Sequence, residues 1–193
     1  MAAQSEFPDY IGVSEVTTSS LDQMVVEGFM DGQHSIMADE PLGFDIGDPP
    51  ELSGQGRGWT PVHYQLAALS MCTAITVRVV ANDQEFKLGR LRTSMQSLID
   101  IRGFFFDLHL QPKFEQIRFG LTLATKEPAA RVRALAKETD RRCPQLGLFR
   151  AAGVPMITEW FRRGESEPVY SQKLAIRGKL PEDRLRAAAS KQR

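Results

Sequence analysis

Apolar and polar residues alternate in short runs at the start of the chain, as they do in β-strands. Residues 23–29 and 33–38 form two such runs, and Asp31 and Gly32 between them are typical of a tight hairpin turn. Residues 39–58 contain five glycines together with several prolines, a composition that favours a loop over a helix or strand. The first part of the chain is therefore predicted to be a β-hairpin followed by a long loop.

The longest apolar segment begins after this loop. Thr60 is a good N-cap, and Pro61 fits the first turn of a helix, where its missing N–H costs nothing. We predict a helix from Pro61 to about Ala81. Its side chains are apolar almost all round as far as Val80, which predicts a helix that lies in a core and is covered by other elements on most sides.

The second half of the chain repeats the change from alternating to helical patterns. A helix that begins after Thr125 must end near Cys143, because the residue before Pro144 is disfavoured in a helix. Strands, a helix, more strands and another helix in this order indicate an α+β protein. The expected elements are strands at 86–97 and 114–125 with a bend at 103–106 between them, a helix at about 126–143, a short helix at 144–151 and a strand at 154–161.

Composition limits the class of protein. The chain has 193 residues, 42% of them hydrophobic and 25% charged, as in an ordinary soluble globular protein. No stretch approaches the ~18 consecutive apolar residues of a membrane helix, and the N-terminus lacks the basic and apolar segments of a signal peptide. We therefore expect a cytoplasmic protein with no membrane partner. There, the two cysteines are reactive, metal-binding or buried thiols rather than a structural disulfide.

Net charge is zero, but the charges are unevenly distributed. Residues 1–58 contain eleven acidic residues and a single cation, Arg57, whereas residues 162–193 contain nine cations and four acids. The two ends are expected to attract each other, within or between subunits. No aromatic residues alternate with the basic ones and no known binding motif occurs there, so we expect no nucleic-acid partner.

Neither a metal nor a cofactor is expected. The three histidines and two cysteines lack the spacing of zinc ligands. The glycines at 54, 56 and 58 do not form the dinucleotide-binding pattern, which requires a strand before the glycines and a helix after them. Chemistry in this chain is therefore expected to rest on its own side chains.

The two cysteines are the candidate reactive groups. They are 71 residues apart, too far for a Cys-x-x-Cys turn but compatible with a tertiary pair. Cys72 lies about eleven residues into the first helix, so it gets no help from a helix N-terminus, and Arg78 lies on a different side of that helix. Cys143 can cap the short helix, with Arg141 and Arg142 as nearby cations. Judged alone, a cysteine in an apolar helix is more often core packing than a reactive thiol.

Four short motifs occur in the order found in one protein family. They are Asp39-Glu40-Pro41, the segment Pro61 to Arg78 around Cys72, Arg102-Gly103-Phe104, and Cys143-Pro144. Through these motifs, roughly residues 23–161 resemble the OsmC/Ohr family of small proteins that reduce organic hydroperoxides with a cysteine pair. We accordingly divide the chain into a weakly patterned N-terminal arm (1–20), an OsmC-like domain (21–161) and a charged C-terminal extension (162–193).

The resemblance implies both a fold and a chemistry. The fold is α+β, with N-terminal β-strands and two long central helices, each preceded by strands, in an intertwined homodimer whose sites lie at the subunit interface. Cys72 takes the role of the thiol that attacks the peroxide, and Cys143 that of the resolving thiol. The implied function is a thiol-dependent peroxidase for organic hydroperoxides, active in oxidative stress defence and regenerated by a dithiol reductant.

The chain departs from this family at the groups that would activate Cys72. Peroxide-reducing members have a glutamate just after the proline that opens the first long helix, and an arginine on an N-terminal strand. Here Val62 and His63 follow Pro61, and no arginine precedes Arg57. The alternative function is therefore a divergent OsmC-like protein that lacks peroxidase activity and binds a small apolar or thiol ligand.

Three residues are candidate replacements for the missing groups. His63 could handle a proton or simply cap the helix. Glu51 and Arg57 would have to reach the site from the loop, whose glycines suit either a movable lid or an insertion. We interpret Arg78 as a structural ion-pairing residue at the exposed end of the helix, and residues 104–106, all phenylalanine, as core or as the wall of an apolar ligand pocket.

Overall fold

The computed structural model describes residues 16–22, 25–30, 34–39, 54–100, 103 and 109–174. These residues belong to two compact units, residues 1–65 and residues 66–193, and each unit is described here by itself. Glu51, the phenylalanines at 104–106, the hairpin turn at 31–33 and the chain after residue 174 lie outside the described residues.

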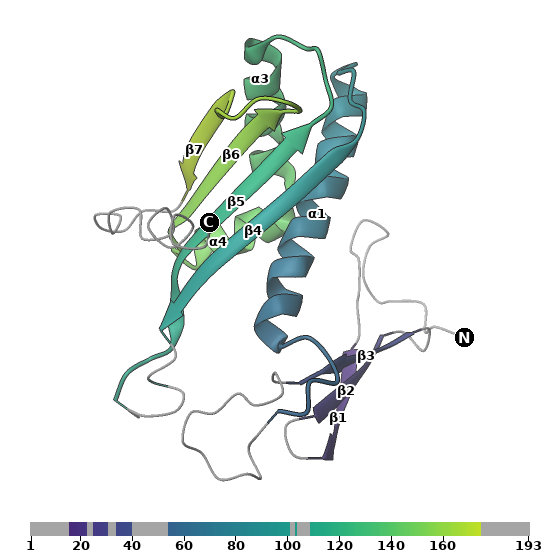
Figure 1. The fold of residues 1–193 in the computed structure, drawn as a ribbon, viewed down its shortest axis with the longest axis vertical. Helices are drawn as coiled ribbons and strands as arrows, with labels where there is room; N and C mark the ends of the chain where they lie inside the picture. Colours follow the sequence, from purple (N-terminus) through teal and green to yellow (C-terminus); the bar gives the residue numbers. More distant parts are fainter. Residues whose placement is uncertain are drawn as a thin grey trace, which may run out of the picture. The chain divides into compact units, whose positions relative to one another are not determined.

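The N-terminal unit contains a three-stranded antiparallel sheet in the order β1-β2-β3 (Figure 1). The predicted hairpin is confirmed as β2 and β3, which pair from Val26–Ala38 to Met30–His34. The third strand, β1, begins at Val16, within the segment for which the pattern predicts only an arm. Its sequence is mostly Thr and Ser, so no apolar alternation marks it, and its pairing with β2 defines it. The strands are β1 (Val16–Asp22), β2 (Val25–Met30) and β3 (His34–Ala38).

The C-terminal unit is a four-stranded sheet in the order β4-β5-β6-β7, with helices covering one face (Figure 1). Strand β5 pairs in parallel with β6, because α3 and α4 carry the chain back across the sheet between them, and the other neighbours are antiparallel. The elements are α1 (Pro61–Asp83), whose first residues belong to the N-terminal unit, β4 (Leu91–Asp100), β5 (Lys113–Leu123), α3 (Ala129–Arg142), α4 (Pro144–Ala151), β6 (Met156–Arg162) and β7 (Tyr170–Leu174).

The predicted α+β fold is confirmed, with two differences in the strands. Strand β4 starts at Leu91 rather than residue 86, because the chain turns after α1 with Glu85 at a φ of 50° and buries Phe86 in the core. Strand β7 lies in the segment 162–193, for which the sequence predicts only a charged peripheral extension. It forms at the sheet edge by antiparallel pairing with β6, where polar side chains are tolerated.

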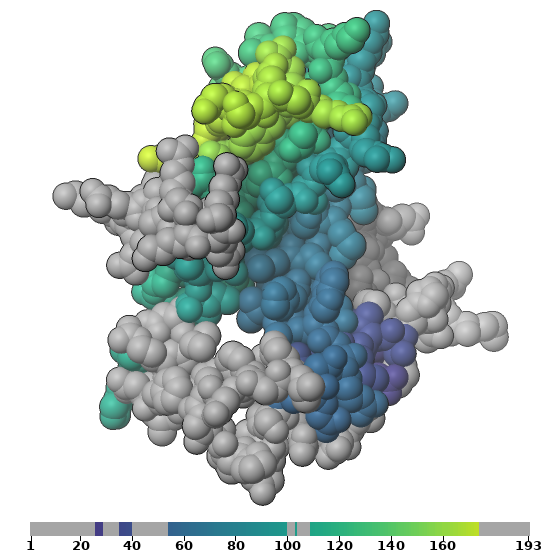
Figure 2. Space-filling model, in the orientation of Figure 1, coloured from purple at the N-terminus to yellow at the C-terminus, as the bar shows by residue number. Residues whose placement is uncertain are grey.

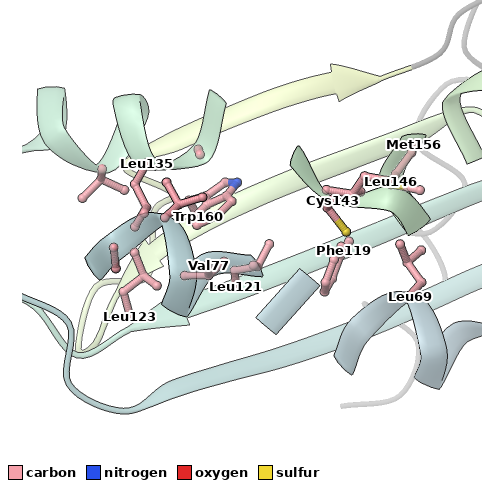
Figure 3. Packing of buried hydrophobic residues seen from close by; sticks show 14 of the residues in the cluster. Leu69, Val77, Phe119, Leu121, Leu123, Leu135, Cys143, Leu146, Met156 and Trp160 are labelled. Carbon is pink, nitrogen blue, oxygen red and sulfur yellow. The ribbon is translucent and has the colours of Figure 1, made fainter. Parts of the chain in front are cut away.

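The core lies between the sheet and the helices. Alternate residues of β5 point to the helical side, where they are fully buried with Leu69 and Val77 of α1 and Leu135 of α3 (Figure 3). Burial of this kind contributes about 25 cal/mol per Å² of apolar surface. The residues of β5 concerned are Ile117, Phe119, Leu121 and Leu123.

Helix α1 is less covered than its sequence predicts. Leu69, Val77 and Val80 are buried, but a stripe formed by Met71, Ile75 and Val79 is 61%, 66% and 44% exposed. These three residues are spaced by four and therefore share one side of the helix. Among the described residues α1 is the one helix long and apolar enough to cross a membrane by length and composition. Its buried side packs in the core of the C-terminal unit, as expected of a core helix.

Candidate functional site

The two cysteines meet in the C-terminal unit. Cys72 lies on α1 and is half-buried, whereas Cys143 lies between α3 and α4 and is 2% exposed. The Sγ atoms are 3.7 Å apart, although the residues are separated by 71 positions. Both thiols are free, and the Cys143 thiol can donate to the Cys72 sulfur. The structure thus forms the tertiary pair that the spacing permits.

The position of Cys143 follows from the proline after it. Pro144 cannot continue α3, so the chain leaves the helix at Cys143, whose φ of −75° and ψ of 116° are extended, and starts α4 at once. The sulfur lies in the core beside Phe119 (Figure 3). Thr73 Oγ1 lies 3.5 Å from this sulfur and donates its own proton to the Leu69 carbonyl at 2.8 Å, so its oxygen is free to accept from the Cys143 thiol.

The surroundings of Cys72 oppose ionisation on balance. Its pKa is raised above the usual value, chiefly by burial, and also by the neighbouring Cys143 thiol. Two neighbouring groups act in the other direction and lower the pKa of Cys72: the backbone N–H of Gln145 and the hydroxyl of Thr76, whose proton goes to the Cys72 carbonyl at 2.9 Å. The described residues around Cys72 therefore do not activate it as a thiolate.

The hydrogen bond from Gln145 brings a helix N-terminus to Cys72 from outside α1. Cys72 lies too far along α1 to use the N-terminus of its own helix, as predicted, but Gln145 belongs to the first turn of α4. The N–H of Gln145 is one of the N–H groups without a partner inside α4, and it favours negative charge on the Cys72 sulfur. The prediction for the helix that carries Cys72 therefore holds, and the donor comes from a different helix. The contact depends on how α4 packs against α1, which no local sequence signal reveals.

The cations next to Cys143 are engaged elsewhere. Arg141 forms an ion pair with Glu138 at 2.7 Å, and Arg142 forms one with Asp83 of α1. These guanidinium groups hold the pKa values of the Glu138 and Asp83 carboxyls below their usual values. Within the described part of the C-terminal unit, no cation donates a hydrogen bond to either sulfur. Arg141 and Arg142 are near Cys143 in sequence, but they bind carboxylates.

In the N-terminal unit, Asp39 organises the segment that leads to α1. Its buried carboxylate accepts hydrogen bonds from the backbone N–H groups of Gln55 at 3.1 Å and Arg57 at 2.9 Å. Gly58 approaches β3 so closely that a Cβ there would lie 2.0 Å from the Met37 carbonyl oxygen. Residues 55–58 are thus tied to β3 rather than forming a free lid.

The residues that could replace the missing glutamate and arginine differ in their surroundings. The exposed Arg57 side chain lines an open hollow of about 640 Å³ together with Trp59 and Tyr64, all of the N-terminal unit. His63 is exposed, and its Nδ1 lies 2.8 Å from the hydroxyl of Thr60, which also accepts the His63 N–H at 3.3 Å. This is the capping histidine that the sequence allows. Glu51 lies outside the described residues.

Two further sequence predictions concern Arg78 and metals. Arg78 is exposed near the end of α1, as predicted, but it donates to the Leu88 carbonyl at 3.4 Å. Within the described ranges it makes no ion pair. No group of three His, Cys, Asp or Glu that could hold a metal ion occurs in the part of the chain that the structure describes.

The pKa of Cys72 leads to a testable pH dependence. In the Cys143→Ser variant, where Cys72 is the only thiol, its alkylation by iodoacetamide should rise about tenfold per pH unit, since only the thiolate reacts. Because burial raises the pKa of Cys72, the rise should continue at pH 9, where a free thiol near pKa 8.5 begins to level off. Stopped-flow or quenched alkylation from pH 6 to 10 measures the profile. A plateau below pH 8 would contradict the expected pKa and reveal an activating cation.

The structure is an α+β protein with a pair of thiols. One thiol lies on α1, and the other belongs to the residue just before Pro144, where α4 begins. The family model described as "OsmC-like protein" matches residues 54–159, more than half of the chain. The chain belongs to the OsmC-like family, as the sequence motifs predict. No curated protein matches the sequence.

Solved structures show the same fold. An OsmC-like protein from Mycoplasma pneumoniae has a TM-score of 0.63 at 11% identity, over 78% of this chain and 97% of its own. The organic hydroperoxide resistance protein OsmC from Legionella pneumophila has a TM-score of 0.57 at 16% identity, over 80% and 98%. An organic hydroperoxide resistance protein from Elizabethkingia anophelis has a TM-score of 0.56 at 10% identity, over 82% and 100%. At these identities the likeness establishes the fold.

Proposed function

We propose that the protein is a thiol-dependent peroxidase that reduces organic hydroperoxides through the Cys72–Cys143 pair in oxidative stress defence. The distance of 3.7 Å between the two sulfurs carries the proposal, because a peroxidase that closes a disulfide needs its second thiol next to the first. Exposure supports the assignment of roles. Cys72 is only half-buried, so it attacks the substrate, while the buried Cys143, whose sulfur lies 3.7 Å from that of Cys72, resolves the intermediate.

The reaction proceeds in three balanced steps. The Cys72 thiolate attacks one oxygen of the hydroperoxide, forming an S–O bond and breaking the O–O bond, and the alcohol leaves after taking up a proton. The Cys143 thiol then attacks the sulfur of the sulfenic acid at Cys72, forming the S–S bond and releasing water. A dithiol reductant of the cytoplasm reopens the disulfide by thiol exchange and leaves oxidised.

Local groups favour specific states along this path. The Gln145 N–H stabilises negative charge on Cys72, both in the attacking thiolate and when the disulfide is reduced. The Cys143 thiol can donate its hydrogen bond either to the Cys72 sulfur at 3.7 Å or to Thr73 Oγ1 at 3.5 Å, and both contacts orient it beside Cys72. The raised pKa of Cys72 favours the alternative, an OsmC-like protein without peroxidase activity that binds a small apolar or thiol ligand.

Stoichiometric oxidation separates the two functions. We expect one equivalent of cumene hydroperoxide, added to fully reduced protein, to consume both thiols rapidly and lower the intact mass by two hydrogens within one chain. Free-thiol titration and intact mass spectrometry measure both changes, with hydrogen peroxide as a substrate control. Thiols that survive as long as an ordinary exposed cysteine would refute the peroxidase and leave the ligand-binding function.

We further propose that the protein acts as a homodimer. The stripe of Met71, Ile75 and Val79 leaves an apolar surface on α1 that a second copy of the same helix would cover, as an isologous interface requires. Leaving this stripe exposed to water costs about 25 cal/mol per Å² of apolar surface, relative to burying it. The stripe lies on the same helix as Cys72, so dimerisation would place the cysteine pair next to the interface.

A further inference from the structure

Three arginines gather on the face of the C-terminal sheet that the helices leave uncovered. Arg90 and Arg92 are two positions apart at the start of β4, and Arg163 follows the end of β6. Together with Thr122 of β5 and Ala124, which follows that strand, they line a cavity of about 250 Å³. The helices lie behind the sheet in Figure 1, so the space-filling view in the same orientation shows this outer face (Figure 2).

Strand register brings the arginines together. Arg92 is opposite Thr122, and the Ala124 N–H donates to the Arg90 carbonyl at 2.8 Å, which extends the β4–β5 ladder by one pair. The Arg163 N–H donates to the Leu123 carbonyl at 2.8 Å and continues the β5–β6 ladder in the same way. Alternate residues share a face, so the arginines lie opposite the core side, where Leu91 and Leu123 point.

The arginine side chains have no acidic partner among the described residues. Neither the cavity nor the hollow beside it, which shares Ala124 and Arg163, is lined by a described carboxylate, and Lys87 and Lys126 add positive charge to that hollow. The nearby acids are engaged elsewhere: Glu127 pairs with Arg131, and Glu165 pairs with Arg162. Three uncompensated cations around one cavity repel each other, and a bound anion relieves this repulsion.

We propose that this cavity is a binding site for the phosphoryl group of a small phosphorylated molecule. Guanidinium groups bind phosphate oxygens with paired, charge-assisted hydrogen bonds, and the hydroxyl of Thr122 adds a further donor. A cavity of about 250 Å³ is smaller than sites for whole drug-sized ligands, so it suits a phosphoryl group whose organic part extends into the hollow beside Lys87 and Lys126. The site uses neither cysteine and is independent of the peroxidase proposal.

Titration of the full chain with inorganic pyrophosphate tests the site. Calorimetry at constant ionic strength should give saturable binding, with Arg92→Gln and Arg163→Gln each weakening the affinity by about tenfold, the loss of one charge-assisted contact. Lys137→Gln, an exposed position on α3, removes the same charge away from the cavity and should leave the affinity unchanged.

Three results would overturn the proposal. One is no binding by the wild type, and another is an equal loss of affinity in Lys137→Gln, which would mean a general charge effect. The third is tight binding of a single-stranded oligonucleotide with none of pyrophosphate, which would assign the arginines to nucleic acid instead. The substituted arginines are exposed, so the variants should unfold at the wild-type temperature, and a thermal melt checks this.

Discussion

Replacing Cys72 by serine should lower the rate of organic hydroperoxide consumption by about 10⁴-fold, a loss typical of removing a nucleophile that forms a covalent intermediate. Among the residues that the structure describes, none is a base that would ionise a serine hydroxyl at this half-buried position, whereas a thiol supplies some thiolate at neutral pH even when burial raises its pKa. Steady-state consumption of cumene hydroperoxide with excess dithiothreitol measures the loss.

Cys143→Ser should behave differently. Cys72 should still consume one equivalent of peroxide at close to the wild-type rate, and the sulfenic acid should then persist until dimedone traps it, because the thiol 3.7 Å away is missing. The neighbouring variant Ser70→Ala, whose side chain contacts Thr93 rather than sulfur, should retain full turnover. Equal activity of Cys72→Ser and the wild type, or a Cys143→Ser variant in which peroxide forms no sulfenic acid that dimedone traps, would refute the assigned roles.

Ile75→Glu should convert the dimer to a monomer. Ile75 is 66% exposed in the single chain, so glutamate costs little in the monomer, but in a helix-to-helix interface it would place an unpaired charge in an apolar surface. We expect the dimer dissociation constant to rise by at least about a hundredfold, the scale of a central contact. Light scattering after size exclusion, from micromolar to submicromolar protein, measures it.

A matched control separates the interface from a general effect of charge. Leu110→Glu changes another exposed apolar residue, in the turn before β5, and should leave the dimer intact. Circular dichroism should show that both variants keep the wild-type fold and unfold within a few degrees of it. A monomeric wild type, or an Ile75→Glu variant that remains dimeric, would contradict the proposed interface.

The elements with a local signal were predictable from sequence. Helix α1 has its N-cap Thr60, its proline and its apolar run, and α3 ends where Pro144 requires. Strands β1 and β7 are polar segments that form by pairing with a neighbour, so no pattern in their own residues reveals them. The parallel pairing of β5 with β6 is likewise a property of the whole sheet.

In the candidate site, too, only the features with a local sequence signal were predictable. The order of the motifs indicated that the two cysteines act as a pair. Three features depend instead on how α3 and α4 pack against α1: the distance between the sulfurs, the contact of the Gln145 N–H with Cys72, and the ion pair of Arg142 with Asp83. Spacing in sequence therefore overestimated the role of the adjacent arginines and missed the helix turn that faces Cys72. Contacts between elements determine the electrostatics here, and they are non-local.

The crossover from β5 to β6 has a consequence for the energetics of the redox cycle. Cys143 sits in this crossover, so the thiols come together only once α3 and α4 have docked on the sheet. A disulfide between them closes a loop of 71 residues, and loop-closure entropy of the unfolded chain would make the oxidised protein more stable than the reduced one by about 4 kcal/mol. Each turnover would then alternate the protein between a more stable and a less stable form, and oxidised chains would be more resistant to proteolysis that acts on the unfolded chain.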